Sequence, residues 1–187
     1  MDYFEQIAIK YYESKGYWTR CGYKIELEGL DPATRAGLVK PTDPRPEIDV
    51  IAFKPGGKEL LIIECKSFLD SGGIKDASFE EGHKHNKRYK LFTDRQKSDA
   101  LKAQLIKQLV KEELLINDKA RTQLVLFAGN VHGRDAEKLK KRFKDAGWQL
   151  VDQAAIVAFL EKLSTSRYEN DPITIVSKLL LRNRVKE

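Results

Sequence analysis

Cysteine is scarce in this sequence, and its scarcity excludes several classes of protein. The 187 residues contain only Cys21 and Cys65, which lie far apart and form no Cys-x-x-Cys pair. Disulfide-stabilised secreted domains and structural zinc sites both need more cysteines at closer spacings. The sequence therefore predicts a protein of the reducing cytoplasm.

Long apolar runs are lacking as well. No stretch approaches the roughly 18 consecutive apolar residues that a membrane span needs, and the start Met1-Asp2-Tyr3 lacks the basic-then-apolar pattern of a secretion signal. Hydrophobic residues make up 41% and charged residues 33% of the chain, a balance typical of a globular protein with a heavily charged surface. We expect no membrane association and a single domain over residues 1–187.

Positive charge is concentrated in one part of the chain. The formal net charge is +6, but residues 84–111 carry nine Lys or Arg against two Asp, so this stretch nets +7 and the rest about −1. A polyanion such as DNA is the partner that this distribution favours, and a merely solvated helix face is the alternative. The residues that we expect to contact DNA are Lys84, Lys87, Arg88, Lys90, Arg95 and Lys97.

The apolar pattern predicts alternating helices and strands. Helices are expected where apolar residues recur every three or four positions, and strands where β-branched and aromatic residues cluster. The polar stretch 28–45 is typical of a loop or a short-turn insertion, and the polar stretch 68–93 is typical of a loop long enough to be functional. The expected helices cover residues 4–15, 98–115, 135–146, 154–163 and 172–181, and the expected strands cover 17–27, 47–53, 59–67, 122–128 and 148–151.

A β-hairpin at 47–67 places charged residues among apolar ones. If Gly56-Gly57 forms the turn, Asp49 lies directly opposite Glu64, with Cβ atoms about 4.5–5.5 Å apart. A turn at Pro55-Gly56 would shift the pairing by two residues and leave the two carboxylates diagonal. Strict alternation keeps the charged side chains on one face in either register. The residues on that face are Glu47, Asp49, Glu64 and Lys66.

Two carboxylates held near a core destabilise the fold unless a positive charge compensates them. Mg²⁺ is suited to this role because it prefers oxygen ligands, typically one or two carboxylates with waters and a substrate phosphate. Lys66, two residues beyond Glu64, can contact the same phosphate or orient the attacking water. The alternative is an ordinary strand end at which Lys66 forms a salt bridge. We predict a metal site with Asp49 and Glu64 as ligands.

The segments Pro46-Glu47-Ile48-Asp49-Val50-Ile51 and Ile62-Ile63-Glu64-Cys65-Lys66-Ser67 resemble the motif of the PD-(D/E)xK nuclease superfamily. Many restriction endonucleases and archaeal-type Holliday junction resolvases belong to it. The expected elements of residues 1–130 agree with its pattern. The resemblance implies an α/β fold with a restriction-endonuclease-like mixed β-sheet sandwiched between helices. Around its αβββαβ core, the chain would carry a basic insertion at 68–97 and a C-terminal helical extension.

The resemblance also implies roles for individual residues. Asp49, Glu64 and the backbone of Cys65 would bind Mg²⁺, for which Mn²⁺ would substitute, and Lys66 would act on the water or the phosphate. The literal Pro-Asp pair of the motif is absent here, which leaves Glu47 as an extra ligand or a partner for Lys66. Many members add a carboxylate from the first helix, and some carry a glutamine on the helix after the lysine strand. The further candidates are therefore Glu5, Glu47, Gln104 and Gln108.

The function that we expect is hydrolysis of DNA phosphodiester bonds by a metal-dependent endonuclease that needs no small-molecule cofactor. The long stretches 28–45 and 68–93 favour a type II restriction enzyme over a Holliday junction resolvase or a structure-specific repair nuclease. A homodimer would present two sites to two strands. The main rival is a DNA-binding subunit that does not cut, and the presence of all three motif residues opposes it. RNA is a third possible substrate, although no aromatic-rich RNA-binding strand is present.

Overall fold

The computed structural model describes residues 2–39 and 44–183. Within these residues, five strands form one mixed sheet in the order β1-β2-β3-β4-β5. The first three strands are antiparallel to one another, and β3, β4 and β5 run parallel. The strands are β1 (Trp18–Lys24), β2 (Glu47–Phe53), β3 (Glu59–Lys66), β4 (Arg121–Ala128) and β5 (Gln149–Val151).

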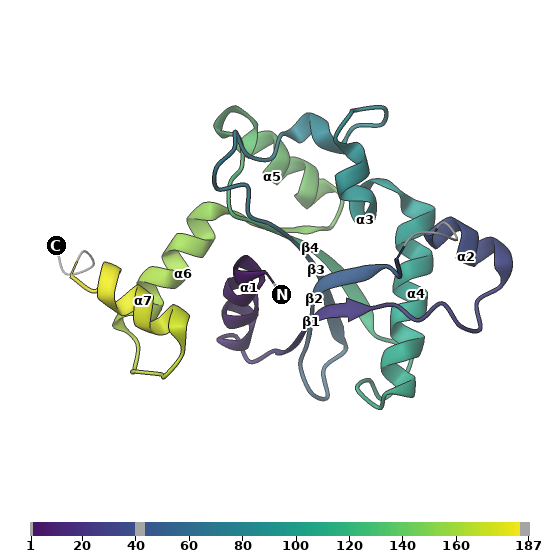
Figure 1. Cartoon of the computed structure of the whole chain (residues 1–187), viewed down its shortest axis with the longest axis horizontal. Helices are drawn as coiled ribbons and strands as arrows, with labels where there is room; N and C mark the ends of the chain where they lie inside the picture. Colours follow the sequence, from purple (N-terminus) through teal and green to yellow (C-terminus); the bar gives the residue numbers. More distant parts are fainter. Residues whose placement is uncertain (1, 40–43, 184–187) are drawn as a thin grey trace.

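Helices cover both faces of this sheet (Figure 1). On one face lie α1 (Tyr3–Glu13) and α6 (Gln153–Thr165), and on the other lie α4 (Arg95–Lys111) and α5 (Ala136–Asp145). The expected α/β architecture with a mixed sheet between helices is confirmed. Among the described residues, no helix is long and apolar enough to cross a membrane. The other helices are α2 (Pro32–Leu38), α3 (Lys90–Thr93) and α7 (Pro172–Leu181).

Alternation along β3 produces two apolar cores. Leu60 and Ile62 pack with α4 and α5, whereas Leu61 and Ile63 pack with α1 and α6. All four side chains are buried, and full burial of each stabilises the fold by about 1.5–3 kcal/mol. A strand that is apolar on both faces is therefore held firmly in the centre of the sheet, which fixes the position of the charged residues at its end.

The β2–β3 hairpin has the predicted register but a different turn. Residues 50–53 pair with residues 60–63 as expected from a turn at Gly56-Gly57. The tight turn itself closes with the Gly57 N–H donating to the Lys54 carbonyl at 2.8 Å, and Gly56 adopts a φ of +72°. Further loop residues follow before β3 begins, and they restore the predicted register.

The stretch 28–45, predicted as a loop, contains helix α2. Asp31 caps this helix by accepting a hydrogen bond from the Thr34 N–H, and Pro32 occupies its first turn. An aspartate followed by proline is a helix-start signal. Sequence reasoning used this signal at Asp171 but not at Asp31, so the prediction was wrong here. Residues 40–43 of this stretch lie outside the described residues.

The stretch 68–93 is also more structured than predicted. It contains 3₁₀ turns at Asp76–Phe79 and Asn86–Tyr89, followed by α3. Phe79 and Phe92 are buried against Phe143 of α5, with ring centroids 5.3 Å apart in both cases. The predicted insertion is therefore an ordered layer over one face of the sheet.

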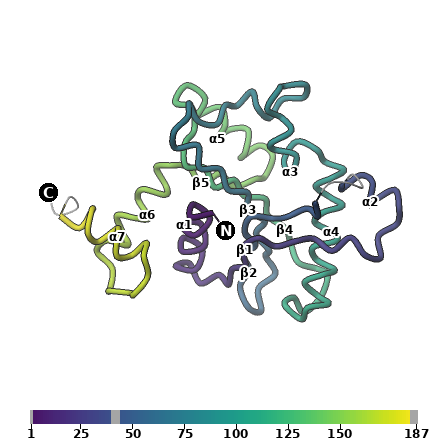
Figure 2. Tube along the Cα trace, viewed as in Figure 1, coloured from purple at the N-terminus to yellow at the C-terminus, as the bar shows by residue number. Residues whose placement is uncertain are grey.

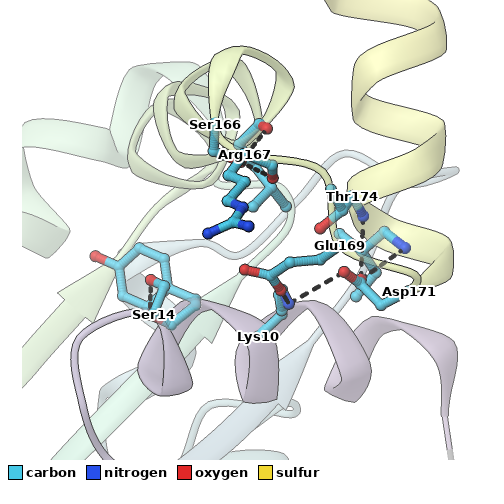
Figure 3. Close-up of polar contacts among 10 residues, drawn as sticks. Lys10, Ser14, Ser166, Arg167, Glu169, Asp171 and Thr174 are labelled. Atoms are coloured by element: carbon cyan, nitrogen blue, oxygen red, sulfur yellow. Dashed lines mark hydrogen bonds and ion pairs between the residues drawn. The ribbon is translucent and has the colours of Figure 1, made fainter.

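Ion pairs attach the segment that leads into α7 to helix α1. Lys10 on α1 forms ion pairs with Glu169 and with Asp171, the latter at 3.1 Å (Figure 3). Asp171 also caps α7 by accepting hydrogen bonds from the N–H groups of Ile173 and Thr174. This contact joins segments from opposite ends of the chain, and in the view of Figure 2 α1 lies between α7 and the strands of the sheet.

Helix α7 has an unusual distribution of side chains. It buries Thr174 and Ser177 but exposes Leu179 and Leu180, whose relative exposures are 77% and 65%. An apolar groove of about 880 Å³ lies between α7 and α1. Exposed apolar surface of this kind is typical of an interaction site.

Candidate active site

Three predicted site residues meet at one end of the central hairpin. Asp49 lies near the start of β2, and Glu64 and Lys66 lie at the end of β3. Because β2 and β3 are antiparallel, the start of one lies beside the end of the other. The N-terminal turn of α1 adds Glu5, whose charge acts on Glu64 and which in turn is affected by Asp49.

Asp49 is anchored to the neighbouring strand by its side chain. Its Oδ2 accepts a hydrogen bond from the backbone N–H of Cys65 at 2.7 Å. In an extended strand the N–H and C=O of one residue point to the same neighbour, so the Cys65 carbonyl also points towards β2. The next carbonyl, of Lys66, points the other way and accepts from the Gly129 N–H at 2.9 Å. The predicted ligand set of Asp49, Glu64 and the Cys65 backbone is thus gathered in one place.

Strict alternation does not extend through Asp49, contrary to our prediction. Ile48 packs in the same core as Ile51, whereas an unbroken strand would place them on opposite faces. The reason lies on β1, where Gly22 stands opposite Asp49 with a φ of +58°. The pairing of β1 with β2 skips this position and resumes between Tyr23 and Ile48, and the side chain of Asp49 bonds to Cys65 on the other neighbouring strand.

Glu64 and Lys66 form an ion pair of 2.5 Å in a half-buried setting. Burial raises the pKa of Glu64 most, Lys66 opposes this rise, and Asp49 and Glu5 add to it. Burial alone would lower the pKa of Lys66, but the carboxylates of Glu64 and Asp49 reverse the effect and raise it. Lys66 is therefore held as a cation among carboxylates.

Asp49 and Glu5 also have raised pKa values. For Asp49 the first cause is burial, which the Cys65 N–H and Lys66 only partly offset. For Glu5 burial again comes first, followed by a hydrogen bond from the Asp2 backbone that acts against it. Glu5 accepts this bond at 3.4 Å as part of the capping box of α1. The positive charge of Lys66 thus offsets only part of the rise in the pKa values of Asp49 and Glu64.

This donor set fits Mg²⁺. Among residues 2–39 and 44–183, no three His, Cys, Asp or Glu side chains form a group that could hold a metal ion. Mg²⁺ is bound in many enzymes by one or two carboxylates, with other oxygens completing its shell. Asp49, Glu64 and the Cys65 carbonyl meet this requirement, and raised carboxylate pKa values are the electrostatic condition that a bound cation relieves.

Comparison with protein-family models, with curated proteins and with solved structures gives no match. What the site can do therefore follows from its own geometry and chemistry.

The other predicted polar residues have different partners. Glu47 lies 4.0 Å from Lys24, its direct partner on β1, and the pairing of β2 with β3 is formed by residues 50–53 and does not reach Glu47. Gln104 donates to the Glu26 carbonyl at 2.8 Å.

Gln108 bonds to the same chain segment as Gln104. Its Oε1 accepts from the Glu26 N–H at 2.9 Å, and its Nε2 donates to the Lys24 carbonyl. Both glutamines thus hold the chain beyond β1 on α4.

The basic residues surround a tyrosine that sequence reasoning missed. Lys84, Lys87, Arg88 and Lys90 are exposed in the insertion, while Tyr89 between them is buried. Burial raises the pKa of Tyr89 to about 12, and the nearby charge of Glu64 contributes to this shift. Tyr89 is thus near enough to Glu64 to respond to its charge. The remaining two predicted DNA contacts, Arg95 and Lys97, lie in the first turn of α4.

Gly129 follows β4 and supports the end of β3. A Cβ atom there would lie 2.4 Å from the Ser67 carbonyl oxygen and 3.0 Å from the ring of Phe4. Gly129→Ala should therefore lower the unfolding free energy by about 1–3 kcal/mol, and should reduce any activity of the site by displacing Lys66. Thermal unfolding with Gly133→Ala as control measures this, since a Cβ at Gly133 meets nothing within 4 Å. Equal melting temperatures for the two variants would contradict the steric argument.

The raised pKa of Asp49 predicts a gain in stability for Asp49→Asn in metal-free buffer. Between the ordinary pKa of an aspartate and the raised pKa, the folded protein binds protons more tightly than the unfolded chain. The stability contribution of this carboxyl therefore falls as pH rises through that window. The variant should melt at a higher temperature than wild type at pH 7, by about 2–4 °C for each kcal/mol. The difference should vanish near pH 4, and a less stable variant at pH 7 would refute this account.

Proposed function

We propose that this protein is a Mg²⁺-dependent DNA endonuclease with a restriction-endonuclease-like fold. The observation that carries the proposal is the meeting of Asp49 and Glu64 with Lys66 at the end of the β2–β3 hairpin. The anchoring of Asp49 by the Cys65 N–H and the shared rise of the carboxylate pKa values support it. The exposed basic residues on either side of Tyr89, whose pKa responds to Glu64, support DNA as the substrate.

Each residue has a role in the proposed reaction. A bound Mg²⁺ would supply positive charge that stabilises the phosphate during the displacement. Asp49, Glu64 and the Cys65 carbonyl would hold the ion, and Mn²⁺ would serve as well. Lys66 would donate a hydrogen bond to a phosphate oxygen or orient the attacking water. Glu5 would act through its charge on these carboxylates rather than through direct contact with substrate.

Incubation of the purified protein with several nucleic acids tests the proposal. Supercoiled plasmid, linear duplex, a four-way junction, single-stranded DNA and RNA are each incubated with Mg²⁺, Mn²⁺ or EDTA. We expect cleavage of duplex DNA with either metal and none with EDTA. Discrete plasmid fragments would favour a restriction enzyme, and preferred cutting of the junction would favour a resolvase. Binding of DNA without any cutting would overturn the proposal and favour a non-cutting subunit.

A homodimer is part of the proposal, because two copies would present two sites to the two strands of a duplex. The exposed leucines of α7 beside the α1 groove form the surface on which a second copy is expected. The double variant Leu179→Glu, Leu180→Glu should sediment as a monomer, since it places charge in an apolar interface. Wild type and a Leu69→Glu control, which alters an exposed leucine elsewhere, should both sediment as dimers. A monomeric wild type would refute this part of the proposal.

A further inference from the structure

A loop leaves the sheet directly after Lys66. This residue ends β3 and pairs with Ala128 of β4, and the chain returns to the same side of β4 at Ile74, which pairs with Val131. Eight positions separate Lys66 from Ile74, but only three separate their partners. The five extra residues are displaced from the ladder, so residues 67–73 form a loop at the edge of the sheet that carries Lys66.

Hydrogen bonds fix the shape of this loop. The Phe68 carbonyl accepts from the Ser71 N–H at 3.2 Å and from the Ser71 hydroxyl at 3.1 Å. Asn130, just beyond β4, donates through Nδ2 to the carbonyls of Phe68 and Ser71, at 3.4 and 2.8 Å. Gly73 lies so close to the same segment that a Cβ atom there would be 2.8 Å from the backbone nitrogen of His132. The loop is therefore held firmly on the residues that follow β4.

The loop presents one large apolar side chain to solvent. Phe68 is half-buried against the core, with a φ of +44° that is rare for a bulky residue. The next residue, Leu69, is 63% exposed. Single exposed leucines are common on protein surfaces, but this one lies on a fixed loop only three positions beyond Lys66. An apolar side chain held in this way beside a DNA site is suited to enter the base stack.

The distance from Lys66 to Leu69 corresponds to a few base pairs. Three residues span at most about 10 Å even when fully extended, and successive base pairs of a duplex lie about 3.4 Å apart along the helix axis. Leu69 therefore reaches base pairs within about three steps of the phosphate that Lys66 would contact.

We infer that Leu69 inserts between two neighbouring base pairs of bound DNA, close to the phosphate that the candidate active site would cleave. This inference rests on the proposed function. An apolar side chain that enters a base step unstacks it and kinks the duplex, at a cost in free energy that depends on how strongly the step is stacked. The inference therefore names a substrate class, duplex DNA with an easily opened step. Pyrimidine–purine steps and mismatches are of this kind.

A fluorescent base reports the unstacking directly. 2-Aminopurine, whose fluorescence rises when it loses its stacked neighbours, is placed in turn at each position of a short duplex, and binding is followed in EDTA. Wild type should raise the fluorescence at one step by about twofold or more. Leu69→Ala should abolish this rise, and Leu69→Met should keep it, because methionine has nearly the same volume. The control Ile116→Ala, which shortens an 86%-exposed side chain before the start of β4, should also keep it.

A mismatched duplex distinguishes insertion from a merely structural role of Leu69. Anisotropy titrations in EDTA compare a fully paired duplex with one that carries a mismatch at the step found above. Wild type should prefer the mismatched duplex by about tenfold, since the cost of opening the step is already removed. Leu69→Ala should bind both duplexes about equally. A variant that only damaged the loop would weaken binding to both and keep the preference.

Two adjacent glycines test whether the loop must be fixed. Gly73→Ala should displace the loop, because a Cβ atom there meets the backbone after β4, and it should reduce the preference for the mismatch. Gly72→Ala is the matched control, since a Cβ atom at that position meets nothing within 4 Å. It should leave the preference unchanged.

Asp70 provides a test of opposite sign. This exposed carboxylate follows Leu69 directly, so insertion of Leu69 would bring it near backbone phosphates. Asp70→Asn should therefore tighten DNA binding by about two- to fivefold at low salt, and the gain should shrink as salt screens the repulsion. Unchanged binding at low salt would show that the tip of the loop lies away from DNA and would overturn the inference.

The outcomes separate this inference from the proposed function. If wild type cleaves DNA but raises the 2-aminopurine fluorescence at no position, Leu69 does not enter the stack and the nuclease proposal stands. The same holds if Leu69→Ala keeps the preference for the mismatch. If the fluorescence rise depends on Leu69 but wild type cuts no DNA, the insertion stands and the nuclease proposal fails. Failure to bind duplex DNA at all would overturn both.

Discussion

Replacement of Asp49 or Glu64 by alanine should reduce Mg²⁺-dependent DNA cleavage by at least about 10³-fold, because each change removes an ion ligand from an assembled site. Lys66→Ala should reduce turnover by about 10²–10³-fold, the size of effect seen when a donor to the developing charge is lost. Binding of metal should largely persist in this variant. Initial cleavage rates on supercoiled plasmid measure the effect, and the rise in melting temperature with Mg²⁺ reports metal binding independently.

A matched control distinguishes loss of the site from loss of charge. Glu59→Ala removes an exposed carboxylate from the opposite end of the same strand and should cleave like wild type. Glu5→Gln should reduce the rate of DNA cleavage by about 10–100-fold, less than the alanine variants of Asp49 and Glu64 and more than Glu59→Ala. The reason is that Glu5 acts on the ion ligands through its charge.

The double variant Asp49→Ala, Glu64→Ala should be hardly worse than either single change, because the site is already broken by the first. Cleavage by Glu64→Ala at the wild-type rate would refute the assignment of the site.

Replacement of Lys87, Arg88 and Lys90 by alanine should weaken DNA binding across all sequences and make it less sensitive to salt. These side chains are exposed around Tyr89, which lies close to Glu64. Each phosphate contact contributes about 0.9 to the slope of log affinity against log salt concentration on duplex DNA. The slope should therefore flatten by about 2–3 units if all three residues contact phosphate. Anisotropy titrations of the Asp49→Ala protein at several salt concentrations measure it.

Helix α5 offers the control for this experiment. It carries three exposed lysines, so that their replacement removes the same charge as the first triple variant. These residues are Lys138, Lys141 and Lys144, and they belong to α5 and not to the insertion. Their replacement by alanine should leave the slope nearly unchanged, and both triple variants should fold normally because exposed charges contribute little to stability. The reverse result would move the phosphate-binding surface from the insertion to α5.

The sequence was most informative where local patterns decide the structure. The apolar hairpin strands, the parallel strand at 121–128 and the helix starting at Pro172 follow from periodicity, turn residues and helix caps. The register that brings Asp49 towards Glu64 was also predictable, because a one-residue slip would expose the apolar side chains of β2 and β3. The short helix α2 was missed although its Asp-Pro start is visible in the sequence.

The contacts of individual polar residues were much less predictable. Gln104 is a glutamine on the helix after the lysine strand, which made it a catalytic candidate. Its side chain bonds to the carbonyl of Glu26, 78 positions away in the chain. Glu47 meets Lys24, which lies directly opposite it on β1, and its Oε1 lies close to Gly22, which adopts a left-handed conformation. A glycine accepts either sign of φ, so its sequence position does not reveal which it takes.

By itself the sequence determined the mixed sheet, the hairpin and the three residues at its end, since each depends on patterns within a few positions along the chain. The tertiary structure decided that Glu5 approaches the carboxylates and that Tyr89 lies near Glu64. These contacts join residues far apart in sequence. They depend on how helices cross the sheet and where insertions fold back, because side-chain packing between elements, and not local periodicity, sets those positions.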